Sequence, residues 1–424
     1  MSAPDRPLVR HAIAGVPVAD LARDFGTPTY VYDAAAIARR VADLSAFDVV
    51  RYAIKANGNL AVLDLLRRHG ALVDAVSAGE IQRALAAGFA PAGDPPPIVY
   101  TADVFDADAL ELVARHGVWV NCGSPDMIDQ YAERVGGGAI TLRVNPGFGH
   151  GHSRKTNTGG EHSKHGIWHE DLDACAERAA RRGLAVAGIH VHIGSGADLG
   201  HLARVAEAVE DFARRVGPSV RYVSAGGGLS VPYRPGDPAL DVAGYHRVWD
   251  AARRRLEAAF DHPVRLEIEP GRYVVAEAGC LVTEVRAVKR EGANTFVLVD
   301  AGFNALARPI LYGAYHPMSL VPAHAGERPV RDVVVGGPLC ESGDIFTQDE
   351  GGIVRTQPLP EARVGDWLVI ESAGAYGFAM ASNYNARPLP AEVLVTDGKA
   401  ELVRARQSLD DLLRGERIPA AAER

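Results

Sequence analysis

VVRYAIKANGNLAVLDLLRRHGALVDAV, residues 49–76, contains two short apolar runs, VVRYAIK and LVDAV, on either side of a helical pattern. The runs are rich in residues that favour strands, and LAVLDLLRRHG between them has the apolar spacing of an amphipathic helix. A strand, a helix and a second strand in this order indicate two parallel strands joined by a crossover helix.

The same alternation continues to about residue 270, with helical patterns such as GEIQRALAAG and EDLDACAERAARRG between the runs. Eight strand–helix units over this length are what a (β/α)8 barrel requires. We therefore predict an α/β fold with a TIM-like barrel over residues 34–280. An open doubly wound sheet is the alternative, and the near-regular spacing favours closure. The six further runs are IVYTA (98–102), VWVNC (118–122), ITLRVN (140–145), AGIHVHI (187–193), RYVSA (221–225) and RLEIE (265–269).

Beyond residue 280 the alternation of strand and helix patterns gives way to strand patterns. CLVTEVRAVKR, TFVLVDAG, GDWLVIESAG and AEVLVTDGKAELVRAR read as strands, and Asp397-Gly398 is a hairpin signal. TPTYVYD (27–33) is strand-like as well. We expect residues 1–33 and 281–424 to form a mostly β domain, a barrel or sandwich, that completes the active site.

Composition excludes several classes of protein. The net charge of −8 gives no general attraction to nucleic acid or to anionic membranes. No apolar run is long enough to span a bilayer, and the N-terminus lacks a secretory pattern, so we expect a cytoplasmic protein. The four cysteines, Cys122, Cys175, Cys280 and Cys340, are too widely spaced for a zinc site or a dense disulfide framework.

Chemically unusual residues fall at the C-terminal ends of the predicted strands. This is where a (β/α)8 barrel carries its active site. The long loop GFGHGHSRKTNTGGEHSKHG (147–166), after the fifth strand, adds to this end and is expected to be functional. The strand-end residues are Lys55, Asp74, Asn145, His192, Ser195, Gly226, Gly227, Gly228, Glu269, Gly271 and Arg272.

Lys55 is the first candidate for chemistry. Only five of the 45 basic residues are lysines, since arginine supplies nearly every other positive charge. A single lysine near a strand is usually a solvated edge residue. Lys55, however, lies in an apolar run at the expected barrel mouth, where a desolvated lysine becomes a nucleophile that forms a Schiff base.

Three other strand-end features suit a phosphorylated cofactor with a ring nitrogen. The glycine run 226–228 lets backbone N–H groups approach an anion, although a bare triplet is more often a plain turn. Arg272 with Gly271, in EIEPGR, would add a second anion contact, and Ser195 a hydroxyl. Glu269, alone best read as a surface acid, would here suit the protonated ring nitrogen of pyridoxal 5′-phosphate (PLP).

HVHIGS (190–195) allows a competing interpretation. Two histidines two residues apart on a strand face the same way and can bind one metal ion, as in metal-dependent hydrolases on this barrel. Such a site needs further ligands at other strand ends, and the sequence supplies none there. We therefore expect no metal, and His192 is better suited to pack on a cofactor ring.

Several motifs together resemble the fold type III PLP-dependent decarboxylases. They are YAIKAN, HIGSG, AGGGLS, EPGR, CESGD, GAYG and SNYNARP. ARPILYGAYH and the loop GHGHSRKTNTGG narrow the resemblance to the diaminopimelate decarboxylases, and it runs from TPTYVYD to SLDDLLRG. Together the motifs are highly specific, whereas GGG or EPGR alone would not be. Gly58, where many relatives carry serine, is a minor departure.

The resemblance implies roles for individual residues. Lys55 would hold PLP as a Schiff base, and His192 would stack on the ring. Cys340 would reprotonate the carbanion left after loss of CO2, and with Glu341 it would reach the active site of a partner subunit in a homodimer. The implied cofactor contacts are Lys55, Asp74, His192, Ser195, Gly227, Gly228, Glu269, Pro270, Gly271, Arg272 and Tyr376. The implied contacts of the substrate, meso-diaminopimelate, are Arg272, Arg308, Tyr312, Glu341 and Tyr376.

Other functions stay open at this point. An ornithine- or arginine-type decarboxylase shares the chemistry, and a racemase on the same barrel is a more distant alternative. A non-catalytic homologue would be expected to have lost Lys55 or Cys340, and both are present. Cys340 would otherwise be a small buried hydrophobe, but Pro338 and Gly343 beside it suggest an exposed loop.

Overall fold

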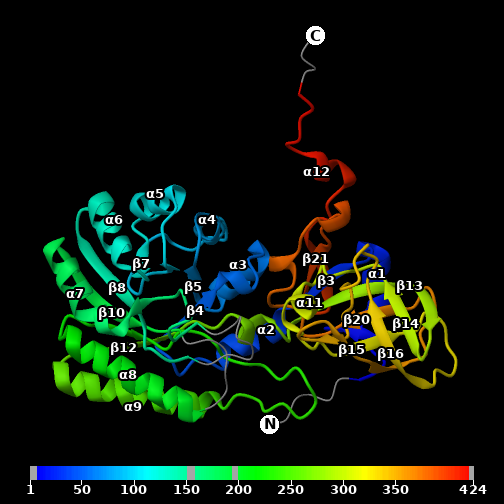
Figure 1. Ribbon diagram of the computed structural model, residues 1–424, viewed down its shortest axis with the longest axis horizontal. Coiled ribbons are helices and arrows are strands. Elements are labelled where there is room, and N and C mark those ends of the chain that lie inside the picture. The colour runs from blue at the N-terminus through cyan, green and yellow to red at the C-terminus, as the bar shows by residue number, and fades with distance from the viewer. Residues whose placement is uncertain (1–6, 150–157, 193–198, 420–424) are drawn as a thin grey trace. The chain divides into compact units, whose positions relative to one another are not determined.

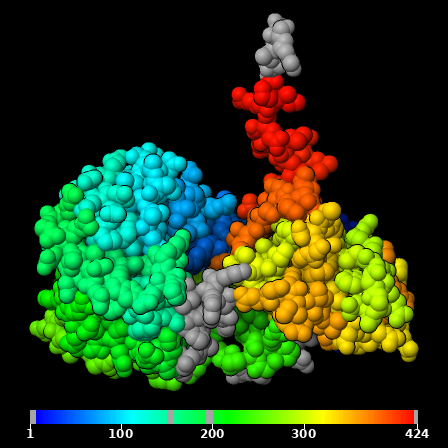
Figure 2. Space-filling view, viewed as in Figure 1, coloured from blue at the N-terminus to red at the C-terminus, as the bar shows by residue number. Residues whose placement is uncertain are grey.

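The computed structural model describes residues 7–149, 158–192 and 199–419 of the chain, which divides into two compact units (Figure 1). The first unit extends from Ala34 to Ala278. The second joins the residues that end at Asp33 to those from Gly279 onward. In Figure 2 the first unit is coloured mainly blue to green and the second mainly yellow to red.

The wall of the first unit consists, within the described residues, of eight parallel strands. Each overlaps one of the eight apolar runs, so the predicted strands are confirmed. They are β4 (Val49–Ala53), β5 (Leu72–Ala75), β6 (Ile98–Ala102), β7 (Trp119–Cys122), β8 (Gly138–Asn145), β10 (Leu184–His190), β11 (Tyr222–Ser224) and β12 (Arg265–Ile268).

The sheet closes on itself. β8 pairs with β10, and β12 pairs with β4 with Glu267 opposite Val49. The (β/α)8 barrel is thus confirmed, and the open doubly wound sheet is excluded. A two-residue strand, β9 (Ile167–Trp168), extends the sheet beside β8.

A helix follows each strand of the barrel, and these helices lie around the strands in Figure 1. Several begin at a side-chain cap. Asn59, Ser77 and Asp106 accept hydrogen bonds from backbone N–H groups of the first turns of α3, α4 and α5, each worth about 1 kcal/mol. The caps fix where each loop at the strand ends stops. The helices are α3 (Leu60–Arg68), α4 (Ala78–Ala86), α5 (Ala107–His116), α6 (Pro125–Val135), α7 (Leu172–Arg181), α8 (Leu199–Val216), α9 (Val242–Phe260) and α10 (Arg272–Val275), and α2 (Ala34–Ala42) precedes the first strand.

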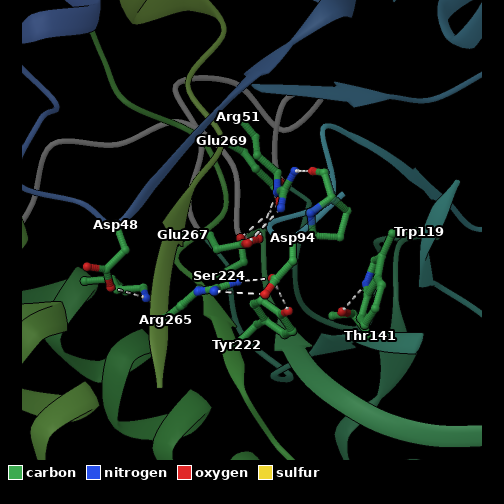
Figure 3. A network of polar contacts seen from close by, with 12 residues as sticks. Asp48, Arg51, Asp94, Trp119, Thr141, Tyr222, Ser224, Arg265, Glu267 and Glu269 are labelled. Atoms are coloured by element: carbon green, nitrogen blue, oxygen red, sulfur yellow. Dashed lines mark hydrogen bonds and ion pairs between the residues drawn. The ribbon is translucent and has the colours of Figure 1, made fainter. Parts of the chain in front are cut away.

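The barrel interior is polar in part (Figure 3). Arg51 of β4 is 1% exposed and donates to both carboxylate oxygens of Glu267 on β12, at 2.9 and 2.8 Å. Its guanidinium also donates to the carbonyl of Pro96. A buried arginine with this many partners is a satisfied ion pair, and it ties the first barrel strand to the last.

The second unit is mostly β, as predicted. The strand path of its main sheet is β19-β16-β14-β13-β3-β21-β22, and β20 pairs with β13 and β15. TPTYVYD forms β3, which lies between β13 and β21. Asp397 and Gly398 both have positive φ, at 50° and 74°, in the turn that joins β21 to β22. The strands are β3 (Thr29–Asp33), β13 (Gly279–Glu291), β14 (Asn294–Val299), β15 (Met318–Val321), β16 (Val330–Gly336), β19 (Gln357–Pro360), β20 (Trp367–Ile370), β21 (Ala391–Thr396) and β22 (Lys399–Arg404).

Apolar residues from both parts of this unit form a shared core. Val31, Cys280 and Val393 belong to β3, β13 and β21, and Leu21 comes from the helix α1 (Val18–Phe25). The unit ends in α12 (Leu409–Leu413), which begins at a capping box on Ser408. No helix in the ranges described is both long enough and apolar enough to cross a membrane.

Candidate active site

Lys55 lies in the tight turn that directly follows β4. It is the middle residue of a 3-10 turn, Ile54–Ala56, rather than the last residue of the strand. Its neighbours Ile54 and Ala56 are buried, and the turn directs the lysine itself into a cavity, where it is exposed. The prediction of a strand-end lysine at the barrel mouth is therefore confirmed in place, but the side chain is more accessible than its apolar flanks suggested.

Asp74 of β5 is 3% exposed, and its Oδ1 has no hydrogen-bond partner among the described atoms. Burial, together with the negative charge of Glu269, raises the pKa of Asp74 to about 8, against the opposing effects of Lys55 and Thr101. At neutral pH this carboxyl is therefore protonated, and it can donate a hydrogen bond.

Asp74 should make the stability of the cofactor-free protein depend on pH. Between pH 3.8 and about 8 the folded protein keeps a proton that the unfolded chain has released. The free energy of unfolding therefore falls as the pH rises through this range. In Asp74→Asn this loss disappears, so the melting temperature of the variant relative to wild type should rise by several degrees from pH 5 to pH 8. Asp108→Asn, on the exposed face of α5, controls for the loss of one carboxylate. An Asp74→Asn difference that is flat with pH would contradict a protonated Asp74.

Glu269 directly follows β12 and is also buried, with 4% exposure. Its Oε1 accepts a hydrogen bond from the hydroxyl of Ser224 at 3.0 Å, and its Oε2 lies 2.6 Å from Nε2 of His190. Burial alone would raise the pKa of Glu269, but the contacts with His190 and Ser224 outweigh it and hold the pKa below its ordinary value. The two buried acids of the site therefore differ in charge: Glu269 is ionised and Asp74 is not.

His192 lies two residues beyond β10. Its Nδ1 accepts a hydrogen bond from the backbone N–H of Gly227 at 2.8 Å. Burial, with the positive charges of Lys55 and Arg143, lowers the pKa of His192 well below its ordinary value, so the imidazole is neutral. A neutral ring beside Lys55 in the cavity suits a flat stacking partner.

The histidine pair of HVHIGS does not converge on a common point. His190 contacts Glu269, whereas His192 contacts the backbone at Gly227. Each imidazole thus has a protein partner of its own, and this arrangement gives no support to the metal-hydrolase alternative.

The glycine run after β11 forms a tight turn. Gly226 and Gly228 have positive φ, at 63° and 87°, and a Cβ at Gly227 would lie 2.4 Å from the carbonyl oxygen of Glu269. Only glycine fits this approach, which joins the loop after β11 to the loop after β12. The N–H of Gly226 donates to Oγ of Ser224 and that of Gly227 to Nδ1 of His192, so an anion at this turn would have to use the N–H of Gly228.

Arg272 stands at the start of α10 beside this turn. Its guanidinium donates to the hydroxyl of Tyr233 at 3.2 Å. Pro270 and Gly271 before it are buried, and the carbonyl of Pro270 accepts a hydrogen bond from the N–H of Ala53 in β4. Ser195, the other hydroxyl expected here, lies outside the described residues.

A cavity of about 710 Å³ opens at this end of the barrel. It reaches from Lys55 and His192 to polar side chains of the strands β6 and β8 and of the loop after β8. These include Thr101, Asp103, Arg143 and His165. Its volume is within the range of sites that bind small molecules.

The 147–166 loop is fastened to the barrel at its first residue, Gly147, and again at Gly160 by Asn145. The amide of this buried residue donates to the carbonyl of Gly160 at 3.1 Å, and its oxygen accepts from the N–H groups of Gly147 and Gly160. Thr158 donates to the carbonyl of His192 at 2.7 Å. Residues 150–157 of this loop lie outside the described part of the chain.

A second fastening involves Asp103, just after β6. His165 Nδ1 lies 2.5 Å from one oxygen of Asp103, and the N–H of Gly166 donates to the other at 2.8 Å. Burial would raise the pKa of Asp103, but these contacts and Arg143 hold it below its ordinary value. The loop after β8 thus forms part of the cavity wall.

Five of the predicted site residues belong to the second unit. Arg308 opens the short helix α11 (Arg308–Tyr312) and is 6% exposed. Its Nη1 lies 3.0 Å from Nε2 of His316, whose Nδ1 lies 2.9 Å from the carbonyl oxygen of Glu371. The network makes Nε2 the acceptor, so His316 is a neutral imidazole that orients the guanidinium. Tyr312 ends the same helix.

Cys340, Glu341 and Tyr376 lie on loops of this unit. The thiol-bearing Cys340 and its neighbour Glu341 are exposed, as Pro338 and Gly343 suggested. The N–H of Cys340 donates to Oδ1 of Asn385 at 2.7 Å, so the SNYNARP segment supports the CESGD loop. Tyr376 has a φ of 56°, in the left-handed region that few non-glycine residues adopt.

Sequence reasoning missed the residues that orient these groups. Ser224 and His190 hold Glu269, His316 holds Arg308, and Asp103 holds the loop through His165. One signal was present: a polar side chain inside an apolar run of a closed barrel, as in AGIHVHI and RYVSA, has only the interior or the wall to face.

The barrel residues fit a bound PLP. The unpartnered Oδ1 of Asp74 calls for a polar group in its vicinity. Lys55 supplies an amine for the aldehyde, the glycine turn and Arg272 supply donors for the phosphate, and Glu269 supplies an anion for a ring N–H. No group of three or more metal-binding side chains gathers within the described residues.

Comparison with known proteins identifies the family. Residues 35–276 match the model of the pyridoxal-dependent decarboxylases' pyridoxal-binding domain. The diaminopimelate decarboxylase of Streptomyces coelicolor is 53% identical over 99% of this chain and 96% of its own length, and that of Escherichia coli K12 is 52% identical over 93% and 94%.

Solved structures give the same result. A crystal structure of a diaminopimelate decarboxylase, 52% identical, covers 93% of this chain and 94% of its own with a TM-score of 0.90. The Helicobacter pylori enzyme, solved in complex with L-lysine, is 32% identical over 93% and 98%, with a TM-score of 0.84. The chain therefore belongs to the diaminopimelate decarboxylases, a family of PLP-dependent lyases.

Proposed function

We propose that this chain decarboxylates meso-2,6-diaminopimelate to L-lysine and CO2, the last step of lysine biosynthesis, with PLP as its cofactor. The observation that carries the chemistry is Lys55, exposed in a cavity that neutral His192 also lines, with its charge acting on the buried, protonated Asp74. The identity of 53% over 99% of the chain to a diaminopimelate decarboxylase supports the choice of substrate.

PLP supplies the electron sink that accepts the bonding electrons when the α-carboxylate leaves as CO2. Lys55 would hold the cofactor through its aldehyde. Glu269 would accept a hydrogen bond from the protonated ring nitrogen, and the neutral imidazole of His192 would pack against the ring. The N–H of Gly228 and the guanidinium of Arg272 would bind the phosphate, while the N–H of Gly227 holds the imidazole of His192 beside it.

The second unit supplies the remaining groups. Cys340 donates a proton to the carbon that has lost its carboxylate, which a thiol can do near neutral pH. Arg308 binds the distal carboxylate of the substrate, and Glu341 binds the distal ammonium. Tyr312 and Tyr376 contact the substrate, and Tyr376 also lies near the phosphate.

We further propose a cytoplasmic homodimer in which Cys340 and Glu341 of one subunit complete the site of the other. The exposed position of both residues supports this, because a group that serves a partner's site must lie on the surface. Leu409 and Leu413 of α12, 70% and 64% exposed, are apolar surface of the kind that interfaces cover. An exposed functional thiol is best kept reduced in the cytoplasm.

The substrate assignment is tested at Arg308. An arginine fork binds a carboxylate through two hydrogen bonds, and a lysine replaces it poorly. Arg308→Lys and Arg308→Ala should raise KM for diaminopimelate by on the order of 10²-fold or more, the effect of about 3–5 kcal/mol for one member of a buried charge pair. The visible spectrum of the bound cofactor should stay unchanged. CO2 and L-lysine are measured with each variant.

The unmodified enzyme should release CO2 from meso-diaminopimelate and not from L-lysine or L-ornithine, which have no distal carboxylate. Arg286→Ala, an exposed arginine of β13, is the matched control and should behave as wild type. Efficient turnover of ornithine or arginine would instead favour the ornithine- or arginine-type alternative.

A further inference from the structure

His190 is the last residue of β10, and its side chain has no exposed surface. Its Nε2 lies 2.6 Å from Oε2 of Glu269, 79 residues away in the sequence. Within the described atoms no hydrogen-bond partner is near its Nδ1. An ionised carboxylate only accepts hydrogen bonds, so Nε2 carries the proton in this contact. The imidazole of His190 therefore donates its hydrogen bond to Glu269.

Arg51, whose positive charge acts on Glu269, is already engaged. Arg51 lies deeper in the barrel, and both oxygens of Glu267 bind its guanidinium. Ser224 is a neutral donor, and its hydroxyl also accepts the N–H of Gly226. His190 is therefore the partner that can add a charge-assisted hydrogen bond to Glu269, and such bonds are about twice as strong as neutral ones.

Two buried acids compete for one negative charge at this place. The charge of Glu269 disfavours ionisation of Asp74, and Lys55 acts on Asp74 in the opposite sense. Asp74 lacks a described partner for Oδ1, whereas both oxygens of Glu269 have one. Glu269 is therefore the ionised member of the pair because its carboxylate receives hydrogen bonds from β10 and β11.

We propose that His190 is a positioning residue that keeps Glu269, rather than Asp74, as the anion of the pair and thereby sets the protonation of the cofactor's ring nitrogen. The proposal rests on the proposed function, since it takes Glu269 as the partner of that nitrogen. His190 itself touches neither cofactor nor substrate in this role. Its effect passes through the orientation and the charge of one carboxylate.

The test uses holoenzyme loaded with PLP that carries 15N at the ring position. The 15N resonance separates a protonated from an unprotonated ring nitrogen, which a merely structural role of His190 would not change. Wild type should give the protonated signal. His190→Leu should lose it, and kcat should fall about 10- to 100-fold with little change in KM, the loss expected for one hydrogen bond to a charged group.

Two further variants keep the test decisive if His190→Leu does not fold or does not load cofactor. His190→Gln retains an N–H donor and should restore most of the protonated signal. Ser224→Ala removes the neutral donor to the same carboxylate and should shift the signal in the same direction, but less. His246→Leu, on α9 against Phe47, is the matched control and should leave the signal as in wild type.

A protonated ring nitrogen in loaded His190→Leu would overturn the proposal. If that variant does not fold or load cofactor, an unprotonated ring nitrogen in His190→Gln, or a signal of Ser224→Ala identical to that of wild type, would overturn it instead. The proposed function fails separately, if wild-type holoenzyme releases no CO2 from meso-diaminopimelate. The 15N comparison needs no turnover, so the two failures are distinguishable.

Discussion

Lys55→Ala protein is expected to lose activity by on the order of 10⁴-fold or more, the usual consequence of removing a nucleophile from covalent catalysis. Lys55 is the lysine that the turn after β4 directs into the cavity beside His192. No neighbouring side chain in the described barrel offers an amine in the same position. The measurement is the initial rate of CO2 release with diaminopimelate at saturating PLP.

The same residue should carry the cofactor in wild-type protein. Borohydride reduction of holoenzyme, followed by peptide mapping, should place the pyridoxyl label on Lys55. Lys164 lines the same cavity and is the informative competitor. Lys289→Ala, an exposed lysine of β13, is the control and should keep full activity. A label on Lys164, or none on a PLP-saturated sample, would rule out the assignment of Lys55.

Cys340→Ala is expected to bind PLP normally and to turn over about 10²- to 10⁴-fold more slowly, because the proton-transfer step loses its acid. The exposed position of the thiol on its loop makes a test between subunits possible. Mixing Cys340→Ala with Lys55→Ala protein should restore about a quarter of the wild-type activity after random subunit exchange, since half of the dimers then contain one intact composite site.

The control for this experiment is a mixture of Lys55→Ala and His192→Ala. Both residues belong to the barrel, so every barrel in the mixture carries one defect and no activity should return. If Cys340→Ala and Lys55→Ala also fail to complement while labelled subunits are shown to exchange, Cys340 acts within its own subunit. The proposal that the two subunits of a homodimer share each active site would then be wrong.

The sequence predicts those features that depend on local pattern. Eight apolar runs predict eight strands because β-branched residues and a fixed alternation with helices leave few alternatives. Lys55 is visible because lysine is rare in this chain, and Asp397-Gly398 is visible because two positive φ angles in succession strongly favour these residues. The turn after β4 is not visible, which is why Lys55 is more exposed than its apolar neighbours suggest.

Features that depend on long-range register are not accessible in this way. The contact of His190 with Glu269 spans 79 residues, and that of Arg51 with Glu267 spans 216. To predict either pair, one has to know the register of the barrel, that is, by how many residues each strand is displaced against its neighbours. Hydrophobic periodicity shows that a residue faces the barrel interior, but it does not show the position of that residue along the barrel axis. The partners of a buried polar side chain therefore stay undetermined.

The position of β3 bears on how the chain is made. Tyr32 of β3 is the Cα partner of Gly279 in β13, so the barrel begins and ends at adjacent backbone positions of the second unit. During synthesis at about 5–20 residues per second, the apolar β3 has to wait on the order of ten seconds or more for β13 and β21 to leave the ribosome. All eight barrel strands precede β13, so they can pair with one another before β21 is made, while β3 still lacks its partner strands. A protease, by the same connectivity, has to cut the chain twice to release the barrel from the rest.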